Sequence, residues 1–412
     1  MLALLILAPL IARLDVSVGG VGWTSPDAVR RLLSSHEGGE YDEDALERDL
    51  ARLRTFGILY DVSAQTRAGG SEIEIDAKDR WSLLPVIGLR RGGGRTTARV
   101  GATDHNAFGR LFTLYGELTS NADLPFVSRK SSDRIGNLVY AEVPRIFGTQ
   151  LTPYLSWSRD FLDFARFGAG GAPEYIYDRS RYALRGELRY EATDLLSLML
   201  GAEGRQDRYA TSDVSKAPGA PPPALDTLSA LAGVQIGYVQ DFVSQQRGTE
   251  LRLFGEAAQT GALSGTLQAR GYYAPLAGHN LCLQLLLQAT TGREESYLFR
   301  AGGLREIRGF IDAYFAGGLM ARGNVEWRAD VLRDTLVVPF IGQVAAFVDG
   351  GYVGRHEGAV AGLAYEGPIL SAGAGVRGIP IPFARAVGRI DVATGLVPRR
   401  TLDVSFSGQQ FF

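Results

Sequence analysis

The chain of 412 residues is long enough for two to four domains of ~100–200 residues, or for one small domain joined to a larger unit. Glycine occupies 52 positions without a G-x-y period and hydrophobic residues make up 45% of the chain, which excludes collagen and intrinsic disorder. The formal net charge of −2 gives no reason to expect nucleic acid as a partner. A single cysteine and four widely separated histidines exclude an internal disulfide and a local metal motif, so we expect no metal and no cofactor.

Residues 1–12, MLALLILAPLIA, form a sustained apolar run at the N-terminus. At ~1.5 Å per residue this run is too short to cross the ~30 Å bilayer core as a helix. Its length suits the hydrophobic region of a secretory signal, although no basic residue precedes it. We interpret it as a clipped or mis-started signal segment. No later stretch reaches 18 uncharged apolar residues, which excludes a bundle of transmembrane helices but not a β-barrel.

Residues 13–79 carry the pattern of a small α/β domain. A first strand alternates apolar and polar residues over 13–18, and Ser25-Pro26 begins a helix that the apolar pattern extends to the glycines at 38–39. A second helix follows the acidic residues 42–44, with Leu46, Leu50 and Leu53 on one face. Two strands, 60–66 and 71–76, complete the unit.

This strand, helix, helix, strand, strand order resembles the POTRA domain, the periplasmic polypeptide-transport-associated module. The phrase Tyr41-Asp-Glu-Asp-Ala-Leu46, followed by Leu53-Arg-Thr-Phe-Gly57, is similar to the second-helix signature of that family. The resemblance implies one POTRA domain located in the periplasm.

Period-two alternation of apolar and polar residues dominates residues 81–412. It predicts a transmembrane β-barrel, the fold class in which such strands hide their apolarity, with 16 antiparallel strands. The predicted strands are 83–91, 95–106, 110–120, 134–147, 150–161, 177–191, 194–209, 228–242, 249–260, 263–276, 279–291, 317–331, 335–350, 367–378, 386–396 and 400–412. A soluble β-sandwich or propeller is the alternative, which the long strands and the lack of a fixed repeat disfavour.

The last predicted strand shows the alternation clearly. Leu402, Val404, Phe406 and Phe412 share one parity, which suits lipid, and Ser405 and its polar neighbours share the other. Aromatic residues near strand ends suit girdles at the two membrane interfaces, and these are Tyr175, Tyr177, Tyr272, Tyr273, Phe411 and Phe412.

A long loop, 292–316, contains Gly302-Gly303 and then Arg308-Gly309-Phe310. The following strands carry Val325-Glu326-Trp327 and Phe347-Val348-Asp349-Gly350-Gly351. These motifs, in this order, resemble the BamA/TamA-type outer-membrane assembly and translocation superfamily, the bacterial surface antigen family. The resemblance spans residues 13–412.

The resemblance implies that loop 292–316 folds into the barrel lumen and is locked there by Arg308, Gly309 and Phe310 against Glu326 and Asp349. It also implies that Phe412, with Phe406, forms a C-terminal assembly signal, although Gln410 stands where the family usually has an aromatic residue. A single POTRA domain is a second departure, because bacterial members often have two to five.

These features predict a bacterial outer-membrane factor that inserts or translocates unfolded polypeptide clients by strand addition at the POTRA domain and at the barrel seam. Its partners would be those clients, outer-membrane lipids and accessory periplasmic or lipoprotein subunits. A passive channel or porin is the alternative function. We expect no enzyme, because the sequence shows neither a G-x-S-x-G elbow nor a convincing Ser, His and Asp set.

Overall fold

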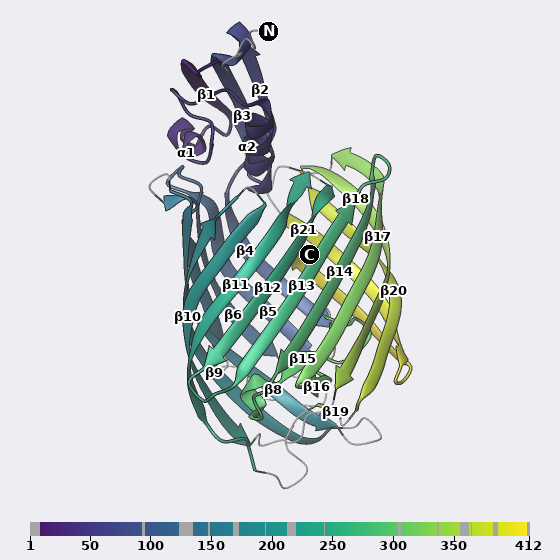
Figure 1. Ribbon diagram of the computed structural model, residues 1–412. Helices are drawn as coiled ribbons and strands as arrows, with labels where there is room; N and C mark the ends of the chain where they lie inside the picture. Colours follow the sequence, from purple (N-terminus) through teal and green to yellow (C-terminus); the bar gives the residue numbers. More distant parts are fainter. Residues whose placement is uncertain are drawn as a thin grey trace, which may run out of the picture.

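The computed structural model describes residues 9–92, 95–122, 135–146, 149–167, 173–193, 195–211, 220–242, 244–303, 306–335, 338–354, 362–363, 365–381 and 386–409. The described chain forms a small α/β domain that sits on one end of a large β-barrel (Figure 1). Within these residues, no helix has the length and apolarity that crossing a membrane requires.

The small domain contains a three-stranded sheet in the order β1-β3-β2 with two helices. Its elements are β1 (Arg13–Gly20), α1 (Pro26–Arg30), α2 (Glu43–Thr55), β2 (Leu59–Arg67), the short 3-10 turn η1 (Ala68–Gly70) and β3 (Glu72–Asp79). Strand β1 runs parallel to β3 and β2 antiparallel to it. The element order is the one that the sequence predicts.

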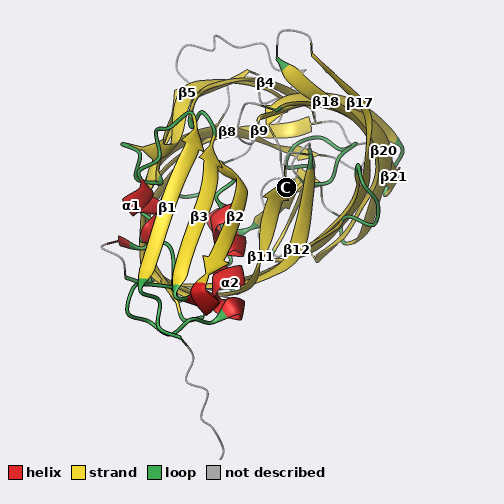
Figure 2. Cartoon of the chain, turned by 90° about the horizontal axis from the view of Figure 1, so that it is seen from above, coloured by secondary structure: helices red, strands yellow, loops and turns green. Residues whose placement is uncertain are grey.

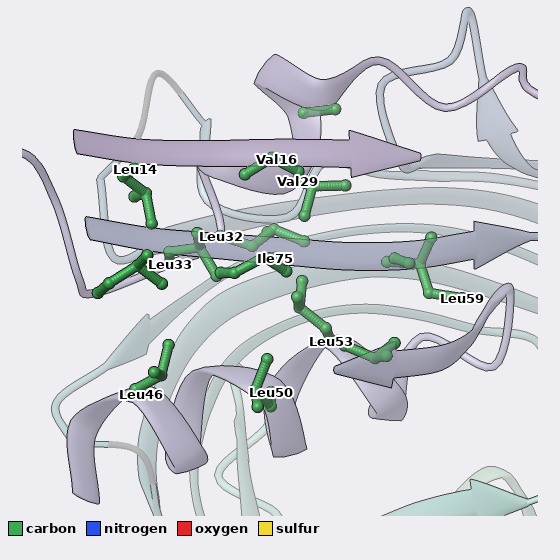
Figure 3. Close-up of a cluster of buried hydrophobic side chains, with 14 of the residues drawn as sticks. Leu14, Val16, Val29, Leu32, Leu33, Leu46, Leu50, Leu53, Leu59 and Ile75 are labelled. Atoms are coloured by element: carbon green, nitrogen blue, oxygen red, sulfur yellow. The ribbon is translucent and has the colours of Figure 1, made fainter. Parts of the chain in front are cut away.

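The core of this domain lies between α2 and the sheet. Leu46, Leu50 and Leu53, which recur at helical spacing, point from α2 toward Ile75 on β3 (Figure 3). All four are buried, and Leu53 and Ile75 have no exposed surface. At η1 the chain turns tightly beside this core, and a Cβ on Gly70 would lie 2.3 Å from the ring of Tyr41.

The first helix is much shorter than the sequence predicts. Its regular part ends at Arg30, whereas the apolar pattern extended it to the glycines at 38–39. The buried carboxylate of Asp49 on α2 accepts the backbone N–H groups of Ser34 and Ser35 at 2.8–2.9 Å. These N–H groups therefore bond to a side chain and cannot continue a helix.

Sixteen long antiparallel strands form the wall of the barrel in the described part of the chain, which confirms the predicted barrel. They are β4 (Leu83–Gly92), β5 (Arg95–Ala107), β6 (Phe112–Ala122), β7 (Ile135–Glu142), β8 (Leu151–Phe167), β9 (Pro173–Glu191), β10 (Leu196–Thr211), β11 (Leu225–Phe242), β12 (Gln245–Ala258), β13 (Leu263–Tyr273), β14 (His279–Thr290), β17 (Leu319–Thr335), β18 (Pro339–Gly354), β20 (Gly367–Pro380), β21 (Ala386–Val397) and β22 (Thr401–Gln409). Three short strands, β15 (Phe299–Ala301), β16 (Phe315–Gly317) and β19 (Gly362–Leu363), pair among themselves and with β8.

The outer face of the wall is apolar and the inner face is polar. On β22, Leu402 is 73% and Val404 54% exposed, whereas Ser405 and Ser407, which have the opposite parity, are buried. The same alternation recurs along the other strands, whose outward residues are mainly Leu, Val and Ile. A band of this kind suits lipid, and it is typical of transmembrane β-barrels.

The predicted aromatic girdles are partly wrong. Tyr175, Tyr177 and Tyr272 are buried, because their parity on the strands directs them inward, and Tyr177 packs against Phe164 in the interior. Among the described residues of this set, Tyr273 alone lies on the outer surface, where it is 66% exposed. Phe411 and Phe412 lie outside the described residues.

The small domain is fixed to the barrel rim and covers part of the barrel mouth (Figure 2). The carboxylate of Asp79 accepts hydrogen bonds from the backbone N–H groups of Gly22, Trp23 and Thr24 at 2.8–2.9 Å. The Thr24 hydroxyl also donates to Asp79, and accepts a bond of 2.8 Å from Asn106 on β5. The end of β3 is thereby connected to the start of the barrel wall.

A second set of contacts joins the helical side of the domain to the wall. Arg145 donates to the carbonyl oxygen of Leu32 at 2.8 Å and to the carboxylate of Glu191 at 2.9 Å. Leu111, in the turn between β5 and β6, is buried in the core of the small domain. Between α2 and the inner wall remains a cavity of about 290 Å³, lined by polar residues that include Arg52 and Arg189.

We expect Asp79→Asn to loosen the small domain from the barrel. Burial alone would raise the pKa of Asp79, but its hydrogen bonds from residues 22–24 hold that pKa below the ordinary value. A depressed carboxyl pKa contributes stability above the unfolded pKa of ~3.9, and this contribution is lost as the pH falls through the folded pKa. At neutral pH the asparagine removes charge-assisted bonds that are worth ~1.5–3 kcal/mol each.

Hydrogen exchange followed by mass spectrometry measures this effect. The amides of residues 22–24 should exchange faster in Asp79→Asn than in the wild type at neutral pH. Acidification should reduce this difference in exchange rate between the two proteins. Asp61→Asn is the matched control, because Asp61 forms an exposed ion pair with Lys78 on the same sheet. Equal protection of residues 22–24 in Asp79→Asn and the wild type would contradict the assignment.

Candidate functional site

The chain between β14 and β17 folds back into the lumen at the end of the barrel far from the small domain (Figure 1). It carries a 3-10 turn, η4 (Glu295–Tyr297), and the strands β15 and β16. This is the segment that the sequence predicts as a long lumen-directed loop, 292–316. We call it the lumen loop.

Arg308, near the tip of the lumen loop, is 2% exposed and lies against two buried carboxylates. Its Nε donates to Oδ2 of Asp349 at 2.8 Å and its Nη2 donates to Oδ1 of the same carboxylate at 2.7 Å. Its Nη1 donates to Oε2 of Glu326 at 2.7 Å. The guanidinium also lies over the ring of Phe347, with 3.3 Å between Cζ and the centroid. The structure therefore brings together the residues that the family resemblance pairs.

Strand parity explains why both carboxylates face inward. Glu326 on β17 pairs with Phe347 on β18, and Asp349 lies two residues further along β18, on the same face. Val325 and Val348, which are adjacent to Glu326 and Asp349 along their strands, are half exposed on the outer surface. Because side chains alternate along a strand, a shift by one residue would direct both acids to the lipid.

The Arg308 contact is part of a larger buried charge network, which sequence reasoning did not assemble. Arg377 donates to Glu326 at 3.2 Å and to Asp391 at 2.5 Å. Arg328 donates to Glu326 at 2.7 Å, Arg389 donates to Asp391, and Arg308 lies 3.6 Å from Asp391. The sequence did contain a signal for these residues. The alternation along two neighbouring strands predicts that Arg377, Arg389 and Asp391 all face inward.

Gly309 and Phe310 bring the tip against the last strands of the wall. Gly309 has φ +86°, and a Cβ there would lie 2.7 Å from the backbone nitrogen of Gly395 on β21. The Gly309 carbonyl oxygen accepts a hydrogen bond from the hydroxyl of Thr401 on β22. Phe310 is 1% exposed and lies above Gly395, where a side chain would strike its ring. The tip therefore requires glycine at 309 and connects the lumen loop to β22.

Apolar packing surrounds the tip. Phe310 meets Phe315 edge to face, with 5.2 Å between ring centroids, and Tyr314 meets Phe315 in the same way at 4.9 Å. The remaining buried members of this cluster are Ala165, Ile176, Ala301, Ile307, Met320, Val353 and Ile369. Because the cluster excludes water, the charges beside it interact in a medium of low dielectric constant.

A second anchor holds the start of the lumen loop to the opposite wall. Glu295 accepts a hydrogen bond of 2.6 Å from the hydroxyl of Tyr177 on β9 and forms an ion pair with Arg300. Ser296 donates its hydroxyl to Asp207 on β10. Asp207 also accepts two bonds, at 2.6 and 3.0 Å, from Arg181. The lumen loop is thus attached to β9 and β10 at one end and to β17, β18 and β21 at the other.

We expect the two anchors to be separable. Asp207→Asn should release residues 295–297, because it leaves the Arg181 charge without its partner, while the Arg308 contacts keep the tip in place. Protease cleavage mapped by mass spectrometry on intact cells would report the two ends of the loop separately. Asp226→Asn is the control, since Asp226 pairs with Arg208 on the exposed surface. Simultaneous release of both ends by Asp207→Asn alone would show that they form one unit.

The seam is the junction at which β22 meets β4 and closes the barrel. Among the described residues its ladder contains one residue pair, Phe406 with Arg91. The neighbouring ladder of β21 and β22 runs instead from Ala386–Gln409 to Gly395–Thr401. Phe406 therefore lies at the seam and is half-buried, whereas Phe412 lies outside the described residues. The proposed role of the two as an assembly signal stays a prediction.

Metal chemistry has no visible support in the described part of the chain, where His, Cys, Asp and Glu side chains do not form a group of three or more suited to an ion. Cys282 is buried in the wall beside Asn280. The site consists instead of ion pairs and close packing, which hold a loop in a lumen.

The described residues form a sixteen-stranded barrel with a small domain at one mouth and an anchored internal loop, and solved structures resemble this chain in fold. BamA from Haemophilus ducreyi lacking POTRA domains 1–3 superimposes with a TM-score of 0.55 and 16% identity, covering 96% of this chain and 84% of that one. CdiB from Acinetobacter baumannii superimposes with a TM-score of 0.66 and 13% identity, covering 97% of this chain and 73% of that one. CdiB from Escherichia coli superimposes with a TM-score of 0.66 and 14% identity, covering 97% of this chain and 76% of that one.

No family model matches the sequence, and no curated protein matches it. The likeness to these solved structures therefore establishes the fold alone. The chain has the barrel fold of BamA and CdiB, and this supports the resemblance to the BamA/TamA-type superfamily that the motifs of the lumen loop and the following strands indicate.

Proposed function

We propose that this protein is an outer-membrane factor that inserts or translocates unfolded polypeptide clients, with residues 13–79 acting as a periplasmic POTRA domain. The observation that carries the proposal is the seam, where β22 and β4 share a single residue pair among the described residues. A closed sheet leaves no free edge in lipid, and every unpaired backbone group there costs several kcal/mol. A seam with so few pairs is the place at which the barrel opens with the least loss of bonding.

Strand addition is the physical basis of the proposed activity. An edge strand offers backbone N–H and C=O groups, which bind an extended client without requiring a particular sequence. The seam supplies such an edge within the membrane. In the small domain, β1 and β2 are the outer strands of the sheet, and each pairs with β3 alone among its described strands. An incoming client segment can pair there before it reaches the barrel.

The lumen loop connects this mechanism to the interior. Its tip contacts Thr401 on β22, one of the two seam strands, through Gly309. Arg308 holds the tip to β17 and β18, and the charge network reaches β20 and β21. The locked loop thereby orders the C-terminal strands as one block, and β4 remains on the other side of the seam.

A passive channel or porin is the alternative. An open pore needs a clear lumen, and here the lumen loop and the small domain both obstruct it (Figures 1 and 2). Neither proposed function requires covalent chemistry, a nucleotide or a metal. Accessory periplasmic or lipoprotein subunits remain part of the proposal, with the small domain as the surface that receives them.

Depletion of the protein tests the proposed function. The outer-membrane and secreted proteomes should lose a defined set of clients, which complementation with the wild type restores and complementation with Arg308→Ala does not. The matched control is Arg293→Ala, because Arg293 lies exposed in the same loop. An unchanged proteome, together with steady solute-selective conductance of the purified protein in planar bilayers, would favour the channel instead.

A further inference from the structure

An exposed aromatic patch lies where the small domain meets the barrel, and the proposed function does not use it. The patch consists of Trp23, Trp81 and Phe108, which are 48%, 41% and 84% exposed. Trp23 belongs to the small domain, Trp81 directly precedes the barrel, and Phe108 lies in the turn between β5 and β6. Large aromatic side chains exposed on a rigid surface usually mark an interface.

Trp81 continues the outer face of the first barrel strand. Trp81, Leu83 and Ile87 share one parity, and all are exposed, with Ile87 at 77%. Leu83 pairs with Asp104, which in turn pairs with Leu114 on β6, and Leu114 is also exposed. The apolar band therefore extends to the level of Leu83. Trp81 lies about 7 Å beyond that level, at ~3.3 Å per residue, where the hydrocarbon core gives way to headgroups.

Trp23 extends this surface onto the small domain. Its ring lies against the ring of Trp81, with 4.6 Å between centroids. The backbone N–H of Trp23 donates to Asp79, and the indole N–H of Trp81 donates to the carbonyl oxygen of Leu83. The two rings are held in place, and their remaining surface is open.

Phe108 is held outward at a conformational cost. Its φ is +59°, in the left-handed region that a non-glycine residue adopts only when its surroundings impose it. The surroundings are rigid here, because the Asn106 side chain accepts from the backbone N–H of Leu111 and donates to Thr24, both at 2.8 Å. The backbone N–H of Ser25 donates to the carbonyl oxygen of Gly109 at 2.8 Å, so the turn is bound to the small domain.

Basic residues flank the patch, as suits anionic headgroups. Arg110 is exposed two residues after Phe108 along the chain. Its carbonyl oxygen accepts a hydrogen bond of 2.8 Å from the side chain of Arg31, the residue that follows α1. Burial lowers the pKa of Arg31 by removing water from its charge, and the nearby positive charge of Arg110 lowers that pKa further. Phosphate groups of lipids would offset that repulsion.

We propose that Trp23, Trp81 and Phe108 form a membrane anchor that inserts into the headgroup region of the periplasmic leaflet. Continuity with the lipid-facing band selects lipid as the occupant, since the patch begins where the outer face of β4 ends. Tryptophan is enriched at this level of a bilayer because its ring is apolar and its N–H is polar. The anchor holds the small domain and the start of the seam strand β4 at the membrane. This proposal rests on the barrel lying in a bilayer, and it does not depend on the identity of the client.

Quenching of tryptophan fluorescence by brominated lipid tests the anchor directly. The full chain is reconstituted in vesicles of phosphatidylethanolamine and brominated phosphatidylglycerol, as variants that keep one tryptophan and carry phenylalanine at the other positions. Trp157 and Trp327, exposed on the outer wall, are the positive controls. Arg67→Trp in a chain without other tryptophans is the negative control, because Arg67 is exposed on β2, away from the barrel strands.

Trp23 and Trp81 should lose as large a fraction of their emission as Trp157, and the tryptophan at position 67 should lose none. Phe108→Asp should reduce the quenching of Trp23 and leave that of Trp157 unchanged. Should the single-tryptophan variants fail to fold, the wild type answers the question, because all four tryptophans should then be quenched together. Unquenched Trp23 and Trp81 beside a quenched Trp157 would overturn the proposal, as expected if a polypeptide covers the patch.

Discussion

Arg308→Ala should release the tip of the lumen loop and abolish most of the client assembly that the protein supports. The arginine is 2% exposed and binds two buried carboxylates, and its removal strands the charge of Asp349, whereas Glu326 keeps its contacts with Arg328 and Arg377. Breaking a buried pair in this way typically costs ~3–5 kcal/mol. Arg308→Lys should not restore function, because lysine lacks the planar fork that binds Asp349 through two nitrogens.

Protease accessibility of residues 300–312 in intact cells, measured beside client assembly, checks this expectation. Asp349→Ala should give a similar phenotype, and the double variant should be less than additive because both changes break one contact. Residues 295–297 should stay protected in Arg308→Ala, since the Tyr177 and Asp207 contacts are intact. Wild-type protection and assembly in Arg308→Ala would refute the lock.

Cysteine pairs across the seam should crosslink less completely than pairs elsewhere in the wall. The seam pair is Phe406→Cys with Arg91→Cys, and the reference pair is Val325→Cys with Val348→Cys, which face each other on β17 and β18. Each backbone hydrogen bond contributes ~0.5–1.5 kcal/mol, so the seam, with one pair in the part of the ladder that the structure describes, should separate far more readily than a continuous ladder. Both pairs are built on Cys282→Ser, which removes the native thiol.

The fraction of the chains that does crosslink at the seam should be inactive in client assembly, and reduction should restore it. A crosslink at Val325 and Val348 should leave assembly unchanged, because β17 and β18 are joined along their whole length. If both pairs crosslink completely and assembly continues, the barrel does not open laterally and the proposed mechanism is wrong.

Local patterns in the sequence were sufficient where one periodicity decides the outcome. On β22, Leu402 and Val404 share the outward parity and Ser405 and Ser407 the inward one, and this parity alone separates lipid from lumen. The helix α2 likewise follows from Leu46, Leu50 and Leu53 at helical spacing. The predictions failed where a distant group intervened, as when Asp49 took the N–H groups that would have continued the first helix.

The candidate site could likewise be predicted from the sequence only in part. The pairing of Arg308 with Glu326 and Asp349 came from motifs and their order, not from periodicity. Nothing local indicated the second anchor, because Glu295 and Tyr177 lie 118 residues apart. Arg377 and Asp391 are neighbours only because β20 and β21 pair in one register.

The sequence by itself determined the alternation of faces, the number of barrel strands and the order of elements in the small domain, because each depends on spacing within a short segment. Only the tertiary structure decided that Arg377, Arg389 and Asp391 join the Arg308 contact, how few described residue pairs close the seam, and where Trp23 meets Trp81. Those contacts depend on the register between strands and on the closure of the barrel, which bring together residues far apart in the chain.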